Sequence, residues 1–243
     1  MKISIITISY NSALTIGETL NSIKNQIQNN IEHIIIDGNS TDNTLKICNQ
    51  FPHISKIISE PDKGVYDAFN KGLRLATGDV VGFLNSDDIF YDNYSLQTIA
   101  ASFDDQIDCI FGNLDYINTE GKIARKWRSK PYRKGDFSKG WMPAHPTFYC
   151  RKPIYDQLGG YDDSFDIAGD FELMLRFLEK NNIRSKYIDK TLVKMMEGGL
   201  SNNGISSKIK IIKEEKRALQ QNKIDFSFFK YFLNKAKKIK EFF

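Results

Sequence analysis

Four short runs rich in isoleucine and valine, separated by segments of helical periodicity, restrict most strongly what this chain can fold into. The runs lie early in the sequence, at Ile3–Ile8, His33–Ile36, Lys56–Ser59 and Asp79–Leu84. Between them, apolar residues recur every three or four positions, which indicates helices with one buried face. This alternation predicts an α/β fold with a mostly parallel sheet flanked by helices and joined by right-handed crossovers.

The second half of the chain is less regular, although three elements are recognisable. Cys109–Gly112 predicts a strand, Leu114–Trp127 a hairpin, and Asp170–Glu179 a helix. No repeat, proline-rich linker or low-complexity block separates the two halves. We therefore expect one domain over residues 1–205, with a first lobe at 1–88 and a second lobe at 89–205.

The end of the chain differs from the rest in charge. The net charge is +4, yet residues 208–243 hold eleven Lys or Arg against four Asp or Glu, which leaves the body mildly acidic. This predicts a basic helical tail at 206–243 with an anionic partner. Within 226–243 one helical arc is apolar and the opposite face carries lysines, as in a helix that lies on an anionic membrane. The alternative is a helix docked on its own domain. No nucleic-acid recognition motif accompanies the charge, so no nucleic acid is expected.

Cysteine usage and hydropathy bear on location. Three cysteines, Cys48, Cys109 and Cys150, lie far apart and form no C-x-x-C pair, which is typical of a reducing compartment. The sequence shows no secretory leader and no run of about 18 apolar residues. We expect a cytoplasmic protein, peripheral on the inner face of the cytoplasmic membrane.

Polar residues follow each of the four predicted strands. They are Ser9-Tyr10-Asn11, Asp37, Asp62-Lys63 and Asn85-Ser86-Asp87-Asp88. Any one of these groups is an ordinary turn or cap, but the carboxyl ends of parallel strands meet at one edge, where open α/β sheets bind ligands. Four groups together predict a ligand site at that edge.

Two common nucleotide sites are excluded by their missing glycines. The turn after the first strand is Tyr10-Asn11-Ser12, without the G-x-G-x-x-G of dinucleotide-binding folds, and no G-x-x-x-x-G-K-[ST] phosphate loop is present. Asp87-Asp88 is the adjacent acidic pair at a strand end of the first lobe. A phosphate ligand would then be held through Mg²⁺ or Mn²⁺, which take one or two carboxylates and complete their shells with phosphate and water.

These residues resemble glycosyltransferase family 2, enzymes of GT-A fold, and within it the bacterial O-antigen and surface-polysaccharide subset. The resemblance covers about residues 1–205. It is carried by several ordered motifs: Ile5–Ser12, Ile36–Thr44, Ser59–Gly64 with Asp67, Asn70, Gly72 and Gly78, Asn85–Asp88, His145-Pro146-Thr147, Gly159–Asp162, Gly169–Glu172 and Gly198–Ser201.

The resemblance implies a role for each strand-end group. Ser9, Tyr10 and Asn11 would lie near the base and ribose, Asp37 near the uracil ring, and Asp62 and Lys63 would contact the nucleotide. Asn70, Asn85 and Ser86 would complete the nucleotide-sugar site, with Asp87 as the principal metal ligand and Asp88 as a second or alternate one. The chain departs from the family's DxD element at Asn85, and from a common Arg at Phe69. That departure leaves Lys63 or Arg74 to meet the phosphates.

The resemblance also places the catalytic base on Asp170, at the start of the predicted helix. A helix cap is the competing interpretation of this residue. His145 and Trp141 are candidates for the acceptor site, although packing in the core explains both equally well. The family inverts the anomeric centre by direct displacement, and this chain offers no nucleophile motif such as G-x-S-x-G.

The function predicted is therefore an inverting, metal-dependent glycosyltransferase in cell-surface polysaccharide biosynthesis. Its donor would be a nucleotide sugar, UDP-linked by resemblance, and its acceptor a saccharide or lipid-linked saccharide. Two alternatives remain open. One is a catalytically degenerate nucleotide-sugar-binding subunit, which Asn85 and Phe69 favour. The other is a sugar-1-phosphate nucleotidylyltransferase, which the turn at Tyr10–Ser12 disfavours because it lacks a glycine-rich, basic loop.

Overall fold

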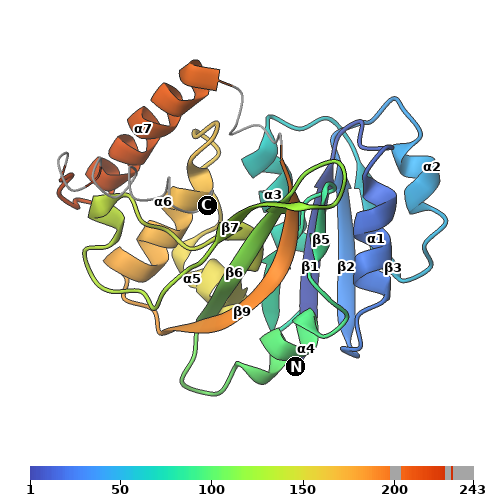
Figure 1. Cartoon of the computed structure of the whole chain (residues 1–243), viewed down its shortest axis with the longest axis horizontal. Coiled ribbons are helices and arrows are strands. Elements are labelled where there is room, and N and C mark those ends of the chain that lie inside the picture. The colour runs from blue at the N-terminus through green and yellow to red at the C-terminus, as the bar shows by residue number, and fades with distance from the viewer. Residues whose placement is uncertain (198–203, 228–230, 232–243) are drawn as a thin grey trace.

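A mixed sheet runs through the protein (Figure 1), which we describe from a computed structural model over residues 1–197, 204–227 and Tyr231. Nine strands of the described residues form this sheet. Their bounds are β1 Ile3–Ser9, β2 Ile31–Asp37, β3 Ile54–Ser59, β4 Val80–Phe83, β5 Asp88–Phe90, β6 Cys109–Ile117, β7 Ile123–Trp127, β8 Tyr149–Arg151 and β9 Ser185–Met196.

The first four strands confirm the predicted parallel arrangement. They lie in the order β3-β2-β1-β4, and every neighbouring pair among them is parallel. The sheet continues through β8, β6, β9 and β5, with β8 antiparallel to both of its neighbours and β7 paired to β6. The carboxyl ends of β1, β2, β3 and β4 therefore share one edge, which we call the ligand edge.

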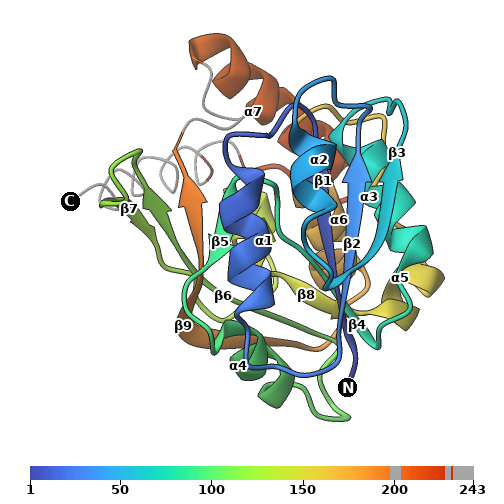
Figure 2. The same ribbon diagram turned by 90° about the vertical axis from the view of Figure 1, so that its right-hand side faces the viewer.

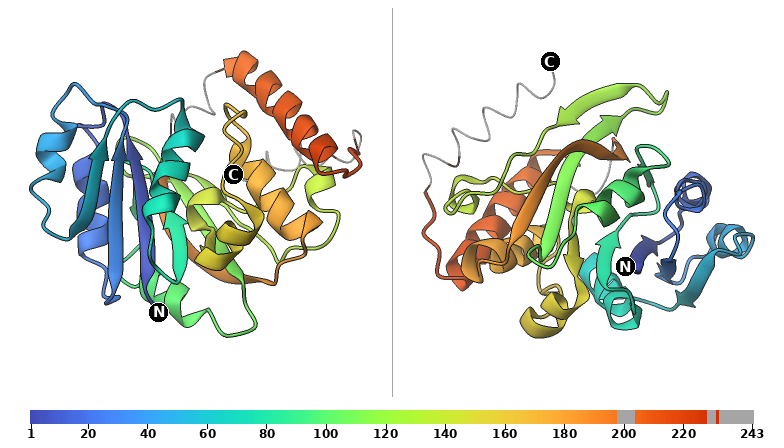
Figure 3. Two further views of the ribbon diagram at one scale, coloured as in Figure 1. Left: turned by 180° about the vertical axis from the view of Figure 1, so that it is seen from behind. Right: turned by 90° about the horizontal axis from the view of Figure 1, so that it is seen from below.

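Helices cover both faces of the sheet. In Figure 3, left, α3, α5 and α6 lie in front of it, while α1 lies on the far side, as Figure 2 shows. A π-helical turn at Arg176–Lys180 extends α6, so the whole predicted helical stretch Asp170–Glu179 is helical. The helices are α1 Ile16–Lys24, α2 Thr44–Cys48, α3 Val65–Leu75, α4 Ser95–Ala101, α5 Lys152–Leu158, α6 Gly169–Leu175 and α7 Gly204–Gln221.

The strands are apolar on both sides because both faces are buried. Within β2, Ile34 and Ile36 belong to the cluster under α3, α5 and α6, whereas Ile35 packs with α1 and α2. Strand geometry turns successive side chains to opposite faces, so an unbroken isoleucine run fills both cores. These runs are therefore visible in the sequence.

Three elements differ from expectation. The apolar periodicity after the first strand predicts a helix through Ile27, but α1 ends at Lys24. The backbone N–H of Ile27 donates instead to the carbonyl of Asn93 at 2.9 Å. β6 extends through the start of the predicted hairpin, since one strand pairs with β8 at its beginning and with β7 at its end. β9, the longest strand of the described residues, was not predicted, because its partly exposed residues carry no clear alternation.

α7, which forms the first part of the predicted tail, docks on the domain. Ala218 and Leu219 are fully buried in the core cluster. Tyr231 is also fully buried, and its hydroxyl donates a hydrogen bond to the Glu215 carboxylate. Phe226 packs half-buried against the same cluster. The residues that would form the apolar membrane arc (Phe228, Phe229, Phe232, Leu233, Ala236, Ile239 and Phe243) lie outside the described residues, as does the motif Gly198–Ser201.

The division of the chain at residue 205 stays a prediction, and so does membrane binding by 226–243. Within the described ranges, no helix combines the length and the apolar character needed to cross a bilayer.

A stacked pair of histidines, His33 in β2 and His53 just before β3, makes the fold sensitive to acid. The His33 and His53 rings lie 5.3 Å apart, and burial, with a smaller contribution from His53, lowers the pKa of His33 from 6.5 to about 3. The unfolded chain binds a proton below pH 6.5 that the folded protein does not bind until about pH 3. Folding is therefore stabilised by the neutral His33 at pH values above 6.5, and this contribution to the free energy of unfolding is lost as the pH falls toward 3.

We expect the free energy of unfolding to fall by about 2–3 kcal/mol through His33 between pH 7.5 and pH 4.5. Urea titrations at the two pH values measure it. The Thr7 hydroxyl lies 3.0 Å from His33 Nε2. In His33→Gln, which has no titrating group but still offers Thr7 a hydrogen-bond partner, the fall should be smaller by that amount. An unchanged pH dependence in the variant would contradict the assignment.

Candidate active site

Asp37 organises the ligand edge at the end of β2. Its carboxylate is fully buried and accepts hydrogen bonds from the hydroxyls of Ser9 (2.9 Å), Ser40 (2.5 Å) and Ser59 (2.7 Å), and from the Ser40 backbone N–H. The ends of β1, β2 and β3 are therefore tied to one charged group. Both oxygens of Asp37 are occupied in this arrangement, and its predicted contact with a uracil ring stays a prediction.

The turn after β1 is held against the turn after β2. Asn11 adopts a left-handed backbone conformation (φ 48°), which Asn tolerates better than most residues, and its side-chain oxygen accepts the Thr41 N–H at 2.9 Å. Its own backbone N–H donates to Ser40 Oγ. Tyr10 is left projecting, with 66% of its surface exposed, so its ring is available for stacking.

Asp62 approaches this surface from the loop after β3. One carboxylate oxygen accepts the Gly64 N–H at 3.0 Å, and the other lies so close to Gly38 that a Cβ there would sit 2.6 Å away. The same Cβ would be 3.5 Å from the Tyr10 ring. Tyr10, Gly38 and Asp62 thus gather at the ligand edge, with the exposed side chain of Lys63 next in the chain.

Oxygen atoms without partners mark the end of β4. Asn85 donates from Nδ2 to Asp88 Oδ2 at 3.3 Å, while Asn85 Oδ1 and Asp88 Oδ1 are buried and have no hydrogen-bond partner in the described part of the chain. Ser86 donates to the hydroxyl of Ser12 at 2.8 Å. Burial raises the pKa of Asp87, and burial together with the nearby Asp87 raises that of Asp88.

This donor set fits a hard divalent cation. Carboxylate and amide oxygens are the ligands that Mg²⁺ and Mn²⁺ prefer, and a cation would supply positive charge beside the partly buried Asp87 and the fully buried Asp88. Across the described residues, no group of three or more His, Cys, Asp and Glu side chains is arranged so that it could hold a metal ion. Asp87 and Asn85 would hold such an ion at an open site, with Asp88 behind them.

Asp170 lies at the start of α6, beside the start of α3. Its Oδ1 accepts the Phe171 N–H at 2.8 Å and a long hydrogen bond from the Tyr66 hydroxyl at 3.5 Å. A Cβ on Gly169 would lie 2.8 Å from the Tyr66 ring, so glycine is required for this approach. Burial, and secondarily the charge of Glu215, raises the pKa of Asp170 to about 6. Because α3 starts after β3, Asp170 also belongs to the ligand edge.

Three other predicted residues are used inside the fold. Asn70 ties α3 to the second lobe through two hydrogen bonds with the Tyr161 backbone, at 2.8 and 2.9 Å. His145 is only 8% exposed, hydrogen-bonds the Tyr161 hydroxyl at 2.7 Å, and burial lowers its pKa to about 4. Trp141 packs half-buried against the core and holds Lys130 over its ring. Their predicted ligand roles stay predictions.

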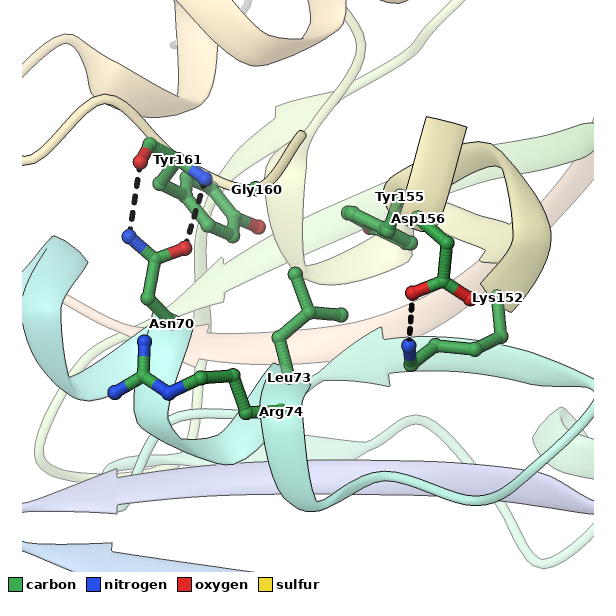
Figure 4. A pocket seen from close by; sticks show the side chains of 8 residues that line it. All are labelled: Asn70, Leu73, Arg74, Lys152, Tyr155, Asp156, Gly160 and Tyr161. Carbon is green, nitrogen blue, oxygen red and sulfur yellow. Dashed lines mark hydrogen bonds and ion pairs between the residues drawn. The ribbon is translucent and has the colours of Figure 1, made fainter. Parts of the chain in front are cut away.

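Arg74 is not at the ligand edge. It lies in the last turn of α3, about 14 Å along the helix from Val65 at nine residues of 1.5 Å each. It lines a pocket of about 490 Å³ between α3 and α5 together with Lys152 and Asp156 (Figure 4), which is also where the Asn70 amide meets the Tyr161 backbone. This position favours Lys63 over Arg74 as the group that meets the phosphates, and that contact stays a prediction.

Sequence reasoning missed the residues that position the predicted ones. Ser40 and Ser59 hold Asp37, Ser12 holds Ser86, and Tyr66 contacts Asp170. Serines near strand ends are too common to single out from a sequence. Tyr66 had a weak signal, since it lies in the first turn of a helix that begins after a glycine, Gly64.

Comparisons with known proteins match this chain to glycosyltransferases. The model of the family described as Glycosyl transferase family 2 matches residues 4–164. A PGL/p-HBAD biosynthesis glycosyltransferase of Mycobacterium bovis is 29% identical over 212 residues, covering 82% of this chain and 78% of its own. An uncharacterised glycosyltransferase of Mycobacterium tuberculosis is 32% identical over 191 residues, covering 72% of this chain and 68% of its own.

Solved structures share the fold. TarS 1-349 of S. aureus in complex with UDP-GlcNAc superposes with a TM-score of 0.70 at 20% identity, over 91% of this chain and 71% of that one. In another crystal structure of TarS 1-349 the chain spans 65% of that protein's length. The mannosyltransferase PcManGT of Pyrobaculum calidifontis, in complex with GDP-Man and Mn²⁺, superposes with a TM-score of 0.67 at 18% identity. The match covers 90% of this chain and 63% of that one. These likenesses confirm the predicted GT-A fold class.

Proposed function

The chain belongs to glycosyl transferase family 2, and from this premise we propose that it transfers a sugar from a nucleoside diphosphate to an acceptor hydroxyl with inversion. The observation that carries the proposal is that two different oxygen-bearing groups lie at the same edge of the sheet. Asn85, Asp87 and Asp88 form a partly unsatisfied cluster, and Asp170 has a pKa raised to about 6. A charged leaving group and a proton acceptor need these two environments.

The donor would lie over the turns after β1, β2 and β3. Tyr10 offers an exposed ring face to the base, and Asp62 has an oxygen that accepts no hydrogen bond from any residue the structure describes. A base N–H donates to a carboxylate of this kind, so we assign that contact to Asp62 rather than to the occupied Asp37. UDP-GlcNAc bound to TarS supports a uridine donor, and GDP-Man bound to PcManGT is the alternative to be tested.

Asp87 and Asn85 would hold Mg²⁺ or Mn²⁺ against the diphosphate. When bound, the ion neutralises charge that develops on the leaving group. The complex of PcManGT with GDP-Man and Mn²⁺ supports a metal in this fold. Lys63 is a basic side chain at the same edge, and it would add positive charge beside the donor phosphates.

Asp170 would remove the acceptor proton. A base works best when its pKa lies near the working pH, because it is then ionised and still takes up a proton readily. Burial tunes Asp170 toward that condition, and the Phe171 N–H and Tyr66 hydroxyl fix one carboxylate oxygen. The other oxygen is the one placed to accept the proton as the hydroxyl attacks the anomeric carbon.

A thermal-shift panel of nucleotide sugars tests the proposal. At a concentration of 100 Kd, a donor with Mn²⁺ should stabilise the folded state by about 2.7 kcal/mol, or roughly 5–10 °C in Tm for a protein of this size. We expect UDP-sugars to exceed GDP-mannose, and Asp62→Ala to reduce the shift. Binding without transfer to any saccharide would instead favour the degenerate subunit, and no shift from any donor would contradict the proposal.

The acceptor we propose is a saccharide or lipid-linked saccharide of cell-surface polysaccharide, reached at the inner face of the cytoplasmic membrane. The support is a lysine face on α7, where Lys208, Lys213 and Lys216 are exposed while both acids of the helix, Glu214 and Glu215, are buried. Such a face is complementary to anionic headgroups. The segment 226–243 would add its apolar arc.

Vesicle sedimentation measures this contact. Each lysine near an anionic surface contributes about 1 kcal/mol, so Lys213→Gln with Lys216→Gln should weaken partition onto vesicles of anionic lipid by about 20- to 30-fold at low salt. Lys46→Gln with Lys56→Gln, on the distant α2 and β3, serves as the charge-matched control. Equal binding by both double variants would contradict a role for the α7 face.

A further inference from the structure

The loop that leads into α6 is anchored by a side chain from outside the first 205 residues. Glu214 of α7 accepts three backbone N–H groups: those of Ile167 and Ala168, both at 2.9 Å on Oε2, and that of Asp166 at 3.2 Å on Oε1. Its side chain is 8% exposed. A buried carboxylate that satisfies three successive amides fixes the backbone firmly, since each amide would otherwise be left without a partner.

Two further contacts join α7 to the same loop. Arg217 lies 3.7 Å from the centre of the Phe165 ring and donates to the Ser164 carbonyl at 2.9 Å. Lys210 pairs with Asp166 at 2.6 Å, but both side chains are about half exposed or more. Exposed pairs of this kind contribute little. Of these three contacts, the Glu214 anchor is the buried one, and it lies nearest to Asp170.

The anchored residues run directly into the proposed base. Ala168 precedes the first residue of α6, and Asp170 is the second. Gly169 packs so closely on the Tyr66 ring that the start of α6 fits in one position, and the 3.5 Å contact between Tyr66 and Asp170 depends on that position. A shift of the loop would therefore move the Asp170 carboxylate.

We propose that Glu214 is a positioning residue, which holds the loop 166–168 so that Asp170 meets the acceptor hydroxyl. The proposal rests on the function proposed above, because it takes Asp170 as the base. Glu214 itself touches no reacting atom in this scheme. It acts by fixing the backbone of the residues that carry the base, and it makes α7 part of the catalytic domain.

The neighbouring Glu215 supplies a second readout. The groups that face Asp170 are the Tyr66 hydroxyl from α3, Tyr161 from the loop before α6, Glu215 from α7 and the Phe171 N–H of its own helix. Glu215 is 3% exposed and receives a hydrogen bond from Tyr231. Its negative charge raises the pKa of Asp170 beyond what burial alone does. The docking of α7 therefore affects the proton affinity of the base.

The test compares Glu214→Ala, Glu214→Gln and Glu32→Ala in the full chain. Glu32 is the matched control, because it is also a buried carboxylate that accepts a backbone N–H, at 2.8 Å from Thr77, but at the opposite edge of the sheet. We expect Glu214→Ala to lower kcat about 10- to 100-fold with donor KM within about twofold, as for a displaced catalytic group. Glu214→Gln keeps a carbonyl acceptor for two of the three amides and should recover most of the rate.

Glu32→Ala should lose a similar amount of stability without loss of kcat at temperatures where it is folded. Amide hydrogen exchange of residues 166–168, which needs no activity, should accelerate in Glu214→Ala and not in Glu32→Ala. Glu215→Gln should move the acid limb of the pH profile of kcat about half a unit to one unit lower.

Three outcomes would overturn the proposal. They are full kcat in Glu214→Ala, equal kcat losses in Glu214→Ala and Glu32→Ala, and unchanged exchange at 166–168. Failure of the function itself is distinguishable, because the unaltered protein would then transfer no sugar, while the exchange measurement would still report whether Glu214 anchors the loop.

Discussion

Replacing Asp170 with asparagine is expected to lower kcat for sugar transfer by about 10²–10⁴, the usual contribution of a positioned base. Asparagine keeps the size of the side chain and the oxygen that accepts the Phe171 N–H, but it cannot take up the proton. Donor KM should change little. In the unaltered protein kcat should be constant well above pH 6 and fall about tenfold per unit below it, because burial raises the pKa of Asp170 to about 6 and the protonated acid is inactive.

Initial rates from pH 5 to pH 8 measure both effects. Asp163→Asn is the matched control, since Asp163 is an exposed carboxylate in the loop that leads into α6. A folded Asp170→Asn protein with unaltered kcat would show that the base is another group, and so would a profile without an acid limb near pH 6.

Loss of the Asp87 carboxylate should have a comparable effect through a different step. We expect Asp87→Ala to lower kcat/KM by about 10³, since a metal at a leaving group is worth several kcal/mol. The Mn²⁺-dependent part of the donor thermal shift should disappear at the same time. Asn85→Asp, which replaces an unpartnered amide oxygen with a carboxylate, should instead lower the Mn²⁺ concentration needed for half-maximal activity.

Asp79→Asn is the control for this prediction, because Asp79 lies just before β4, at the opposite edge, where it accepts the Lys2 N–H at 2.7 Å. It should leave the metal response unaltered. If Asp87→Ala retained a normal Mn²⁺ response, the ion would have to bind elsewhere, and the metal assignment at β4 would be wrong.

The sheet could be predicted from the sequence because its strands are buried on both faces. Ile34, Ile35 and Ile36 serve two cores, so the strand is an unbroken apolar run. β9 escaped prediction for the opposite reason. Its position is set by pairing with β6 rather than by its own pattern, and such a pairing is a property of the tertiary fold.

The gathering of these polar residues at one edge was also predictable, whereas the use of each of them was not. Parallel strands bring Ser9, Asp37 and Asn85 to one edge whatever their partners are. Whether a polar side chain faces a ligand or holds a loop depends on distant residues. Asn70 binds the backbone of Tyr161, which is 91 residues away, and no local pattern contains that information.

The helix α7 shows most clearly what the sequence alone does not reveal. The acidic pair Glu214 and Glu215 stands out on a basic helix, yet charge and periodicity alone present α7 as a solvated element. Only the packed structure shows that these two acids lie on its buried face, beside Ala218 and Leu219.

The docked α7 determines how short a working version of this protein can be. A truncated form that stops at residue 205 would lose three fully buried side chains, Ala218, Leu219 and Tyr231, and the acceptor of three amides in front of Asp170. Lack of activity in such a truncated form would therefore be explained by the loss of the α7 contacts. It would not show whether the catalytic residues lie within the first 205 residues.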